Sequence, residues 1–146
     1  MKLLITGATG LIGTQITKVL LDSDIDVNYL TTSKEKIEHK KGYRGFFWDP
    51  ENGVIDSDAF KDVTAIINLV GASIGERWTK SYKKVILESR TQTANLLFDT
   101  LQEIDHQITH FISASGVSVY PSHKSKLYRE NDPEVAKTFL GEVVVA

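Results

Sequence analysis

The chain has 146 residues, of which 41% are apolar and 25% are charged, and this balance predicts one globular domain. A net charge of −2 gives no electrostatic reason to expect nucleic acid or an anionic membrane as a partner. No apolar run approaches the ~20 residues that span a bilayer. The absence of cysteine excludes disulfides, thiolate zinc sites and a cysteine nucleophile. The first residues lack the pattern of a signal peptide, so we expect a cytoplasmic location.

Expected strands alternate with expected helices along the chain, which predicts an α/β fold with a Rossmann-like doubly wound parallel sheet in three α/β/α layers. Strands are expected at residues 2–5, 26–30, 45–48, 65–70 and 108–113. Helices are expected at residues 11–21 and 79–103, with Thr79 as N-cap of the second, and a helical turn is expected at 56–61. Residues 34–41 form a polar stretch that is helical in one interpretation, and 121–134 are irregular. Residues 136–145 either begin a further helix or, because valine is a poor helix former, end in a strand.

The turn after the first expected strand carries three glycines spaced three apart, where a strand passes into a helix. Gly7 permits the tight turn, Gly10 leaves room for a pyrophosphate beside the backbone, and Gly13 lets the helix pack close to the strand. The free amides of the first helical turn would then face the phosphates. The expected cofactor contacts in this turn are Gly7, Thr9, Gly10, Leu11, Ile12 and Gly13. The alternative is a structural glycine-rich turn without a ligand.

The end of the second expected strand selects the cofactor in dinucleotide-binding folds. An acidic residue there binds the ribose hydroxyls of NAD, whereas an arginine accommodates the 2′-phosphate of NADP. This chain has no acid at that position; Thr31 and Thr32 can donate to a phosphate, and Lys34 or Lys36 can supply positive charge. The pattern favours NADP(H) over NAD(H). The alternative is a solvated threonine-rich loop.

Seven short segments, in order along the chain, resemble one protein family. They are residues 6–13, 48–50, 67–71, 77–79, 88–90, 112–116 and 139–143. The resemblance is to atypical, extended short-chain dehydrogenase/reductases of the NAD-dependent epimerase/dehydratase family, including its cell-division-inhibitor-like members. It implies an NAD(P)-binding Rossmann domain over residues 1–146. Family members are longer than this chain, so the resemblance also implies the N-terminal half of a longer protein that stops before a substrate-binding lobe.

Four further cofactor contacts, in two places, follow from the resemblance together with position. Leu69, Val70 and Gly71 end the fourth expected strand, on the edge of the sheet where ligands bind in this fold. Arg90 lies on or beside the inward apolar face of the helix at 79–103, and a cation there needs an anionic partner. The resemblance supplies one, a phosphate or ribose of the cofactor. The alternatives are an ordinary strand end and an arginine that extends to the edge of the apolar stripe.

The resemblance also implies a catalytic hydroxyl after the fifth strand, paired in most short-chain reductases with a Tyr-x-x-x-Lys motif on the next helix. Ser115 occupies the hydroxyl position, and its alternative is a turn residue bonded to local backbone. Tyr120 and Lys124 have the motif's spacing, but they follow Ser115 closely in a proline-containing stretch, so we interpret them as an accidental match. Residues 139–143, the usual place for the pair, contain neither tyrosine nor lysine.

Three functional hypotheses remain. The first is an NADP(H)-binding oxidoreductase or nucleotide-sugar-epimerase-like protein that transfers hydride on a carbonyl or carbinol of a small-molecule substrate. The second, motivated by the missing Tyr/Lys pair, is a non-catalytic module that senses the state of the dinucleotide. The third is a fragment that is inactive without its substrate lobe. The four histidines have no metal-ligand spacing, so no metal site is expected.

Overall fold

Five parallel strands form the centre of the computed structural model, which describes residues 1–146. Their order across the sheet is β4 (Tyr43–Asp49), β2 (Asp26–Thr31), β1 (Lys2–Thr6), β6 (Ala65–Asn68) and β7 (His110–Ser113). The chain therefore fills the sheet outward from β1 in one direction and then outward from β6 in the other. Ligands bind where the strand order reverses in this way, here between β1 and β6. The predicted Rossmann-like parallel sheet is confirmed.

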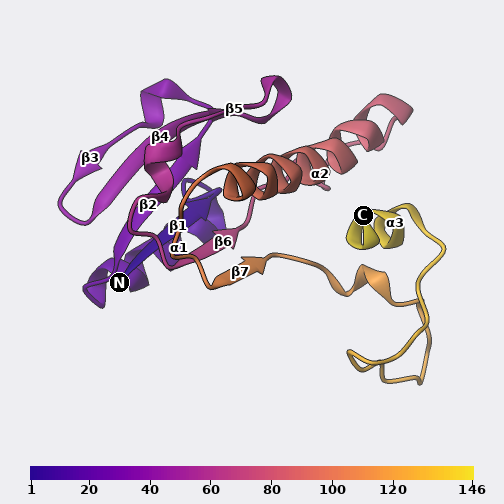
Figure 1. Cartoon of the computed structure of the whole chain (residues 1–146). Helices are drawn as coiled ribbons and strands as arrows, with labels where there is room; N and C mark the ends of the chain where they lie inside the picture. Colours follow the sequence, from indigo (N-terminus) through magenta and orange to yellow (C-terminus); the bar gives the residue numbers. More distant parts are fainter.

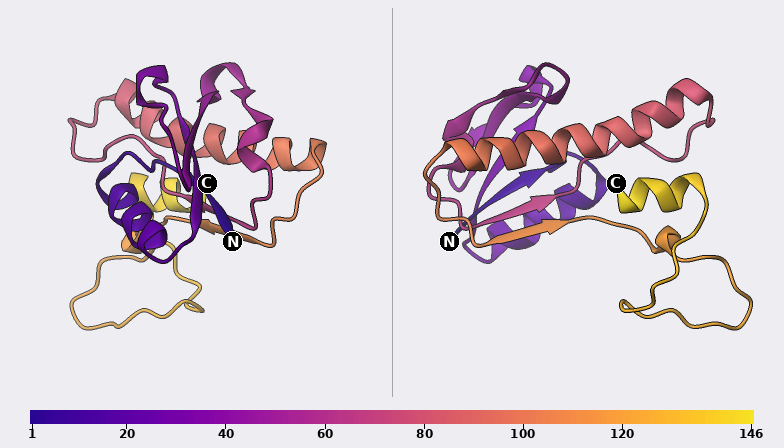
Figure 2. Two further views of the ribbon diagram at one scale, coloured as in Figure 1. Left: turned by 90° about the vertical axis from the view of Figure 1, so that its left-hand side faces the viewer. Right: turned by 45° about the vertical axis from the view of Figure 1, so that its right-hand side comes forward.

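One helix packs on each face of the sheet (Figure 2). Successive side chains of a strand point to opposite faces, so Leu4 joins the core beneath α2 (Lys80–Glu103), whereas Ile5 joins the core beneath α1 (Leu11–Asp22). Leu97 of α2 is fully buried in the same core cluster as Leu4. The three-layer α/β/α arrangement and both predicted helices are confirmed. Thr79 caps α2 as predicted, because its side chain accepts a hydrogen bond from the amide of Tyr82.

Two short antiparallel strands at the β4 edge were not predicted. They are β3 (His39–Lys40) and β5 (Val54–Ile55), both paired with β4. The polar stretch at 34–41 is one 3₁₀ turn, η1 (Lys34–Lys36), followed by β3, so a helix over the whole stretch is wrong. A buried tyrosine explains the difference: the hydroxyl of Tyr29 donates to the carbonyl of Lys36 at 2.6 Å and accepts from the amide of Glu38 at 2.8 Å.

The remaining short elements are 3₁₀ turns. They are η2 (Pro50–Asn52), η3 (Ser57–Phe60) and η4 (Val117–Val119). The first begins with the side chain of Asp49 accepting from the amide of Asn52, and the second is the helical turn expected at 56–61. Residues 121–134 contain no helix or strand, as predicted.

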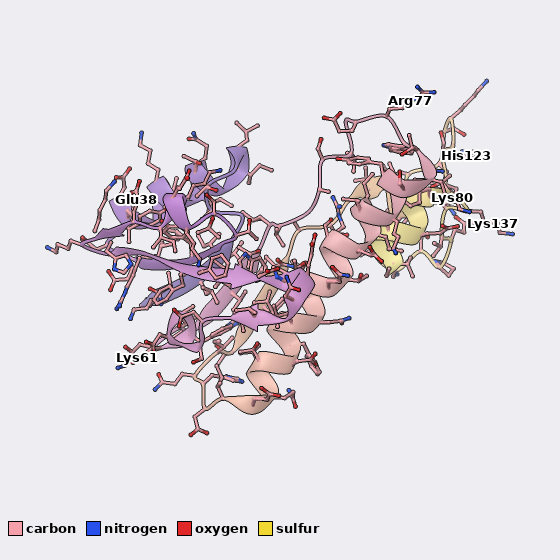
Figure 3. The ribbon with its side chains drawn as sticks, turned by 90° about the horizontal axis from the view of Figure 1, so that it is seen from above. Glu38, Lys61, Arg77, Lys80, His123 and Lys137 are labelled. Atoms are coloured by element: carbon pink, nitrogen blue, oxygen red, sulfur yellow. The ribbon has the colours of Figure 1, made fainter.

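The last helix, α3 (Phe139–Val145), lies apart from the sheet beside the first half of α2 (Figure 1). Thr138 caps it by accepting from the amide of Gly141, and the ring of Trp78 packs edge-on against Phe139 with 5.6 Å between centroids. The helix predicted over 136–145 is confirmed, and the alternative of a terminal strand is wrong, because this cap and the burial of Val143 outweigh the poor helix propensity of valine. Figure 3 shows this end of the molecule, with Arg77, Lys80, His123 and Lys137, opposite Glu38 and Lys61.

No helix in the fold, including the 24-residue α2, has both the length and the apolar character needed to cross a lipid bilayer.

Candidate functional site

The glycine-rich turn lies between β1 and α1, at the point where the strand order reverses. Gly7 has φ +72°, a left-handed conformation that favours glycine, and a Cβ there would lie 3.3 Å from the carbonyl carbon of Leu69. Gly13 is buried where α1 crosses this turn, and a Cβ on Gly13 would overlap the carbonyl oxygen of Gly7 and the Cα of Ala8. The roles predicted for Gly7 and Gly13 in turn formation and close packing are confirmed.

The first turn of α1 presents unpaired backbone donors. Gly10 is the N-cap, and its amide donates to the carbonyl of Gly7 at 3.0 Å. The amides of Leu11, Ile12 and Gly13 have no hydrogen-bond acceptor in the chain, and no side chain caps the helix. Unpaired amides at the positive end of the helix dipole stabilise an anion. An arrangement of this kind can accept a phosphate group.

Three neighbouring strands are joined at their carboxyl ends by a buried polar network. The hydroxyl of Thr6 donates to Asn68 Oδ1 at 2.6 Å and accepts from the amide of Leu69 at 3.2 Å. The side-chain nitrogen of Asn68 donates to Ser113 Oγ at 3.3 Å. Thr6 and Asn68 are both buried, so each depends on the other for its hydrogen bonds. The network fixes the edge of the sheet on which the site is built.

A cavity of about 800 Å³, which we call the β4-side cavity, lies between the ends of β2 and β4 and the first half of α2. Its walls include Thr32, Trp48, Asp49, Gly71 and Ser89. Trp48 is only 1% exposed and belongs to the core, and it also lines this cavity. A half-enclosed space with an aromatic wall and polar groups at its rim suits a flat, partly polar ring system.

A second cavity of about 480 Å³, the β7-side cavity, lies between the ends of β6 and β7, α2 and α3. Ser115 and Arg90 line it, and so do Asn68 and Leu69. Val70 lines both cavities, which therefore meet at the end of β6. Ser115 is exposed and its hydroxyl has no hydrogen-bond partner in the chain, unlike that of Ser113, so it is free to contact a ligand.

The structure separates the two lysines that the sequence left as alternatives. The Nζ of Lys34 lies 5.0 Å from the centroid of the Phe47 ring, and Phe47 lines the β4-side cavity together with Thr32. Lys36 makes no corresponding contact. Thr31 is buried, and its hydroxyl accepts from the amide of Ser33 at 3.2 Å. Thr32 is thus an exposed threonine in the wall of the β4-side cavity, and the ammonium group of Lys34 lies against Phe47, another residue of that wall.

Arg90 has backbone partners in the chain. Its Nη1 donates to the carbonyl of Ile86 at 2.9 Å, and Nη1 and Nη2 each lie 3.3 Å from the carbonyl oxygen of Ala72. The guanidinium forms no ion pair with an acid. Half-buried on the inward side of α2, it lies under the loop that follows β6.

Some of the predicted contacts lie outside both cavities. Thr9 lines a third cavity, of about 450 Å³, between α1 and the hairpin of β3 and β4. The other turn residues and Thr31 border none of the three; they are Gly7, Gly10, Leu11, Ile12, Gly13 and Thr31. The turn thus contributes no lining residue to the β4-side and β7-side cavities.

Tyr120 and Lys124 do not form a catalytic pair, as predicted. Tyr120 follows η4, its hydroxyl donates to the carbonyl of Arg129 at 3.0 Å, and its ring stacks on Tyr128. Lys124 lies in the irregular segment rather than on a helix with Tyr120. His123 accepts hydrogen bonds from neighbouring amides and so has a local structural role. No cluster of three or more histidines and acids is arranged to hold a metal ion.

The titrating groups with shifted pKa values lie away from the two cavities. Burial raises the pKa of Tyr43, which stacks on Tyr29 beneath α1. A hydrogen bond to Glu38 raises the pKa of Lys40, and one to Glu134 raises that of Lys126. These shifts come from structural contacts and do not mark the site.

Comparison with known proteins agrees with this geometry. Residues 3–138 match the NAD dependent epimerase/dehydratase family. The chain belongs to this family. An epimerase family protein of Staphylococcus saprophyticus is 37% identical over 142 residues, which are 97% of this chain and 46% of that protein. An epimerase family protein of Mycobacterium leprae is 30% identical over 130 residues, 88% of this chain and 40% of its own. The chain thus spans about half the length of the curated relatives it matches.

Solved structures of the epimerase/dehydratase family share the fold. The human epimerase family protein SDR39U1, solved with NADPH, superposes with a TM-score of 0.77 at 25% identity, over 99% of this chain and 46% of that one. A nucleoside-diphosphate sugar epimerase from Corynebacterium glutamicum superposes with a TM-score of 0.75 at 29% identity, over 99% of this chain and 29% of that one. The resemblance predicted from the seven segments is confirmed, and the chain has the Rossmann fold of the family's NAD(P)-binding domains.

Sequence reasoning missed two residues of the site, Thr6 and Ser89. Thr6 is the fully buried end of β1 and stands in the segment 6–13, which carries the family resemblance, but only the structure shows its hydrogen bonds with Asn68 and with the amide of Leu69. Ser89 stands directly before Arg90, in one of the segments that carry the family resemblance, so a signal was present. The sequence does not say that its hydroxyl accepts from the amide of Ala72.

Proposed function

We propose that residues 1–146 form one NAD(P)-binding Rossmann domain that binds NADP(H) in preference to NAD(H) across the carboxyl edge of the sheet. The observation that carries the proposal is the row of unpaired amides at Leu11, Ile12 and Gly13, behind a glycine turn where the strand order reverses. These amides would hold the diphosphate. The proposed contacts are Gly7, Thr9, Gly10, Leu11, Ile12 and Gly13 in the turn, Thr31 and Thr32 after β2, and Leu69, Val70, Gly71 and Arg90 along the crevice.

The two cavities suit the two halves of a dinucleotide. The β4-side cavity, with Trp48 in its wall and Thr32 at its rim, would take the adenosine; the β7-side cavity, with Ser115, would take the nicotinamide and the reacting carbon. Their junction at Val70 lies at the end of β6, next to the glycine turn. The cofactor would supply or accept a hydride, and Ser115 would hold the substrate oxygen by donating a hydrogen bond.

The preference for NADP(H) rests on the charge at the mouth of the β4-side cavity. Thr31, Thr32 and Ser33 are neutral donors, and Lys34 lies against Phe47 beside them. No carboxylate follows β2 to repel a 2′-phosphate before Glu35. The human family member solved with NADPH is consistent with this preference.

A non-catalytic function is the second candidate, and one observation favours it. The hydroxyl of Tyr120 is bonded to the carbonyl of Arg129, and α3 carries no Tyr/Lys pair, so the usual proton-transfer machinery is missing. In this role the domain would bind the dinucleotide and report its redox state to a partner. The coverage of 46% of the relatives supports a third view, that substrate is bound by sequence outside this chain.

Titration with NADPH and with NADH, followed by tryptophan fluorescence, tests the proposed function. Trp48 lies in the wall of the β4-side cavity, so NADPH should quench its emission and accept energy from it, at lower concentration than NADH. The variant Trp78→Phe removes the other tryptophan and assigns the signal. Saturable binding of neither nucleotide would overturn the proposal.

Turnover of NADPH with a panel of carbonyl substrates separates the catalytic from the sensing role. If the domain catalyses hydride transfer, Ser115→Ala should bind NADPH normally and lose about 100-fold in turnover, because one positioned hydrogen-bond donor contributes roughly that much. Turnover that is unchanged in Ser115→Ala would remove this residue from the mechanism. Tight binding without turnover of any substrate would favour the sensing module.

A further inference from the structure

Two consecutive residues of α2 hold the loop that follows β6. They bond the backbone amide and the backbone carbonyl of one loop residue, Ala72. The amide of Ala72 donates to Ser89 Oγ at 2.9 Å. The carbonyl oxygen of Ala72 accepts from both terminal nitrogens of Arg90, each at 3.3 Å. Ala72, which lies outside the sheet, is thus held at both its amide and its carbonyl group.

The two side chains are themselves anchored on one carbonyl. Ser89 Oγ donates to the carbonyl of Ile86 at 3.0 Å, and Arg90 Nη1 donates to the same oxygen at 2.9 Å. Ile86 is a fully buried residue of α2 itself. The guanidinium is rigid and planar. The hydrogen bond of Nη1 to the carbonyl of Ile86 therefore helps to fix the direction in which Nη1 and Nη2 meet the carbonyl of Ala72. The loop therefore takes its position from the core side of α2.

Gly71 fits this arrangement because it has no side chain. A Cβ at Gly71 would lie 2.8 Å from Arg90 Cζ and 2.9 Å from Nη2. The guanidinium occupies the space that any other residue would need, so packing as well as hydrogen bonding couples Gly71 to Arg90.

The held loop lies between the two cavities. Gly71, Ala72 and Ser89 line the β4-side cavity, whereas Arg90 lines the β7-side cavity. A shift of this loop would therefore enlarge one cavity at the expense of the other.

We propose that Ser89 and Arg90 are positioning residues, which hold the loop at Gly71 and Ala72 as the partition between the two cavities. The partition sets the spacing of the sites for the two halves of the dinucleotide, so that both halves bind at once. The inference rests on the proposed dinucleotide binding. It gives Arg90 a role in addition to the proposed contact with the cofactor, because Arg90 also acts through the carbonyl of Ala72.

The first test compares whole and half ligands. Dissociation constants for NADPH and for 2′,5′-ADP, which carries only the adenosine half, are measured for the wild type, Ser89→Ala and Arg90→Lys. We expect NADPH to bind roughly tenfold more weakly in each variant, with a smaller change for 2′,5′-ADP, because the loss falls on the linkage of the halves. Thr100→Ala, which removes a similar hydroxyl bonded to the carbonyl of Leu96 far from the loop, is the control and should bind as the wild type does.

The second test asks whether Gly71 and Arg90 act as one unit. Gly71→Ala alone should weaken NADPH binding, because its Cβ meets the guanidinium and displaces it from the carbonyl of Ala72. In the Arg90→Ala background that space is empty, so adding Gly71→Ala should cause no further loss. Losses that multiply would show that Gly71 and Arg90 act independently, and that result would overturn the inference.

Hydrogen exchange distinguishes failure of the positioning role from failure of the proposed function. Without nucleotide, hydrogen exchange at the amide of Ala72 should be faster in Ser89→Ala than in the wild type, because its acceptor is gone. Unchanged exchange, or wild-type NADPH affinity in both Ser89→Ala and Arg90→Lys, would refute the positioning role while leaving the proposed function intact. A wild type that binds neither NADPH nor 2′,5′-ADP would refute the proposed function and this role with it.

Discussion

The strands on the two sides of the switch point between β1 and β6 differ sharply in burial. In β2 every residue from Val27 to Thr31 is buried, whereas all four residues of β7 are exposed, with Phe111 at 45% and Ile112 at 57%. The enclosed side carries the glycine turn and the β4-side cavity; the open side carries Ser115 and leads to α3 (Figure 1). The contrast teaches that the part proposed to bind the nucleotide can rest on well-buried strands, while Ser115, the residue proposed for chemistry, follows a thinly packed edge strand.

The largest expected effect is on the free energy of unfolding, and it is tested by one truncation on each side of the switch point. Leu4→Ala empties a fully buried position in β1 and should lower the free energy of unfolding by about 2–5 kcal/mol. Ile112→Ala in β7 removes a side chain that is more than half exposed, so we expect a loss below about 1 kcal/mol. Urea unfolding of both variants measures the difference. Equal losses would show that β7 is packed as tightly as β1 in solution, and the contrast between the two sides would fail.

The next effect concerns the glycine turn on the enclosed side. Gly13→Ala places a methyl group against the carbonyl of Gly7, so α1 must move away from the turn, with a loss of about 1–3 kcal/mol in stability. The movement should also displace the unpaired amides and weaken NADPH binding at least tenfold. Thermal unfolding and nucleotide titration measure the two losses. The control is Gly75→Ala in the exposed loop before α2, where a Cβ has only an ordinary contact at 3.4 Å. A Gly13→Ala variant that binds NADPH normally would contradict the proposed diphosphate site.

The smallest effect sharpens the assignment of charge at the β4-side cavity. Lys34→Ala should weaken NADPH binding by about 1 kcal/mol, roughly fivefold, because one exposed ammonium–phosphate contact is lost. NADH binding should not change, since NADH has no 2′-phosphate. Lys36→Ala, in the same 3₁₀ turn, is the matched control and should behave as the wild type does with both nucleotides. Equal weakening of NADPH and NADH by Lys34→Ala would argue against a 2′-phosphate contact.

Local patterns in the sequence predicted the parts of the fold that depend on neighbouring residues. The turn at residues 6–13, the cap at Thr79 and the apolar strand of β6 are read from a few adjacent residues, and the structure confirms them. The short strand β3 was missed because its position depends on Tyr29, a residue of another strand. Weak local preference in a polar stretch leaves such a choice to distant contacts.

Within the site, the residue types were predictable and their partners were not. The alternation of strands and helices and the glycine spacing determined by themselves the parallel sheet and the turn between its first strand and first helix, because backbone conformation and side-chain period are local properties. The family followed from the resemblance of the seven segments, which the match over residues 3–138 confirms. Only the tertiary structure decided that Lys34 rather than Lys36 lies against Phe47 of the cavity wall, and that Arg90 meets the carbonyl of Ala72. The direction of a long charged side chain depends on acceptors and rings that folding brings from other elements, and no nearby residue encodes them.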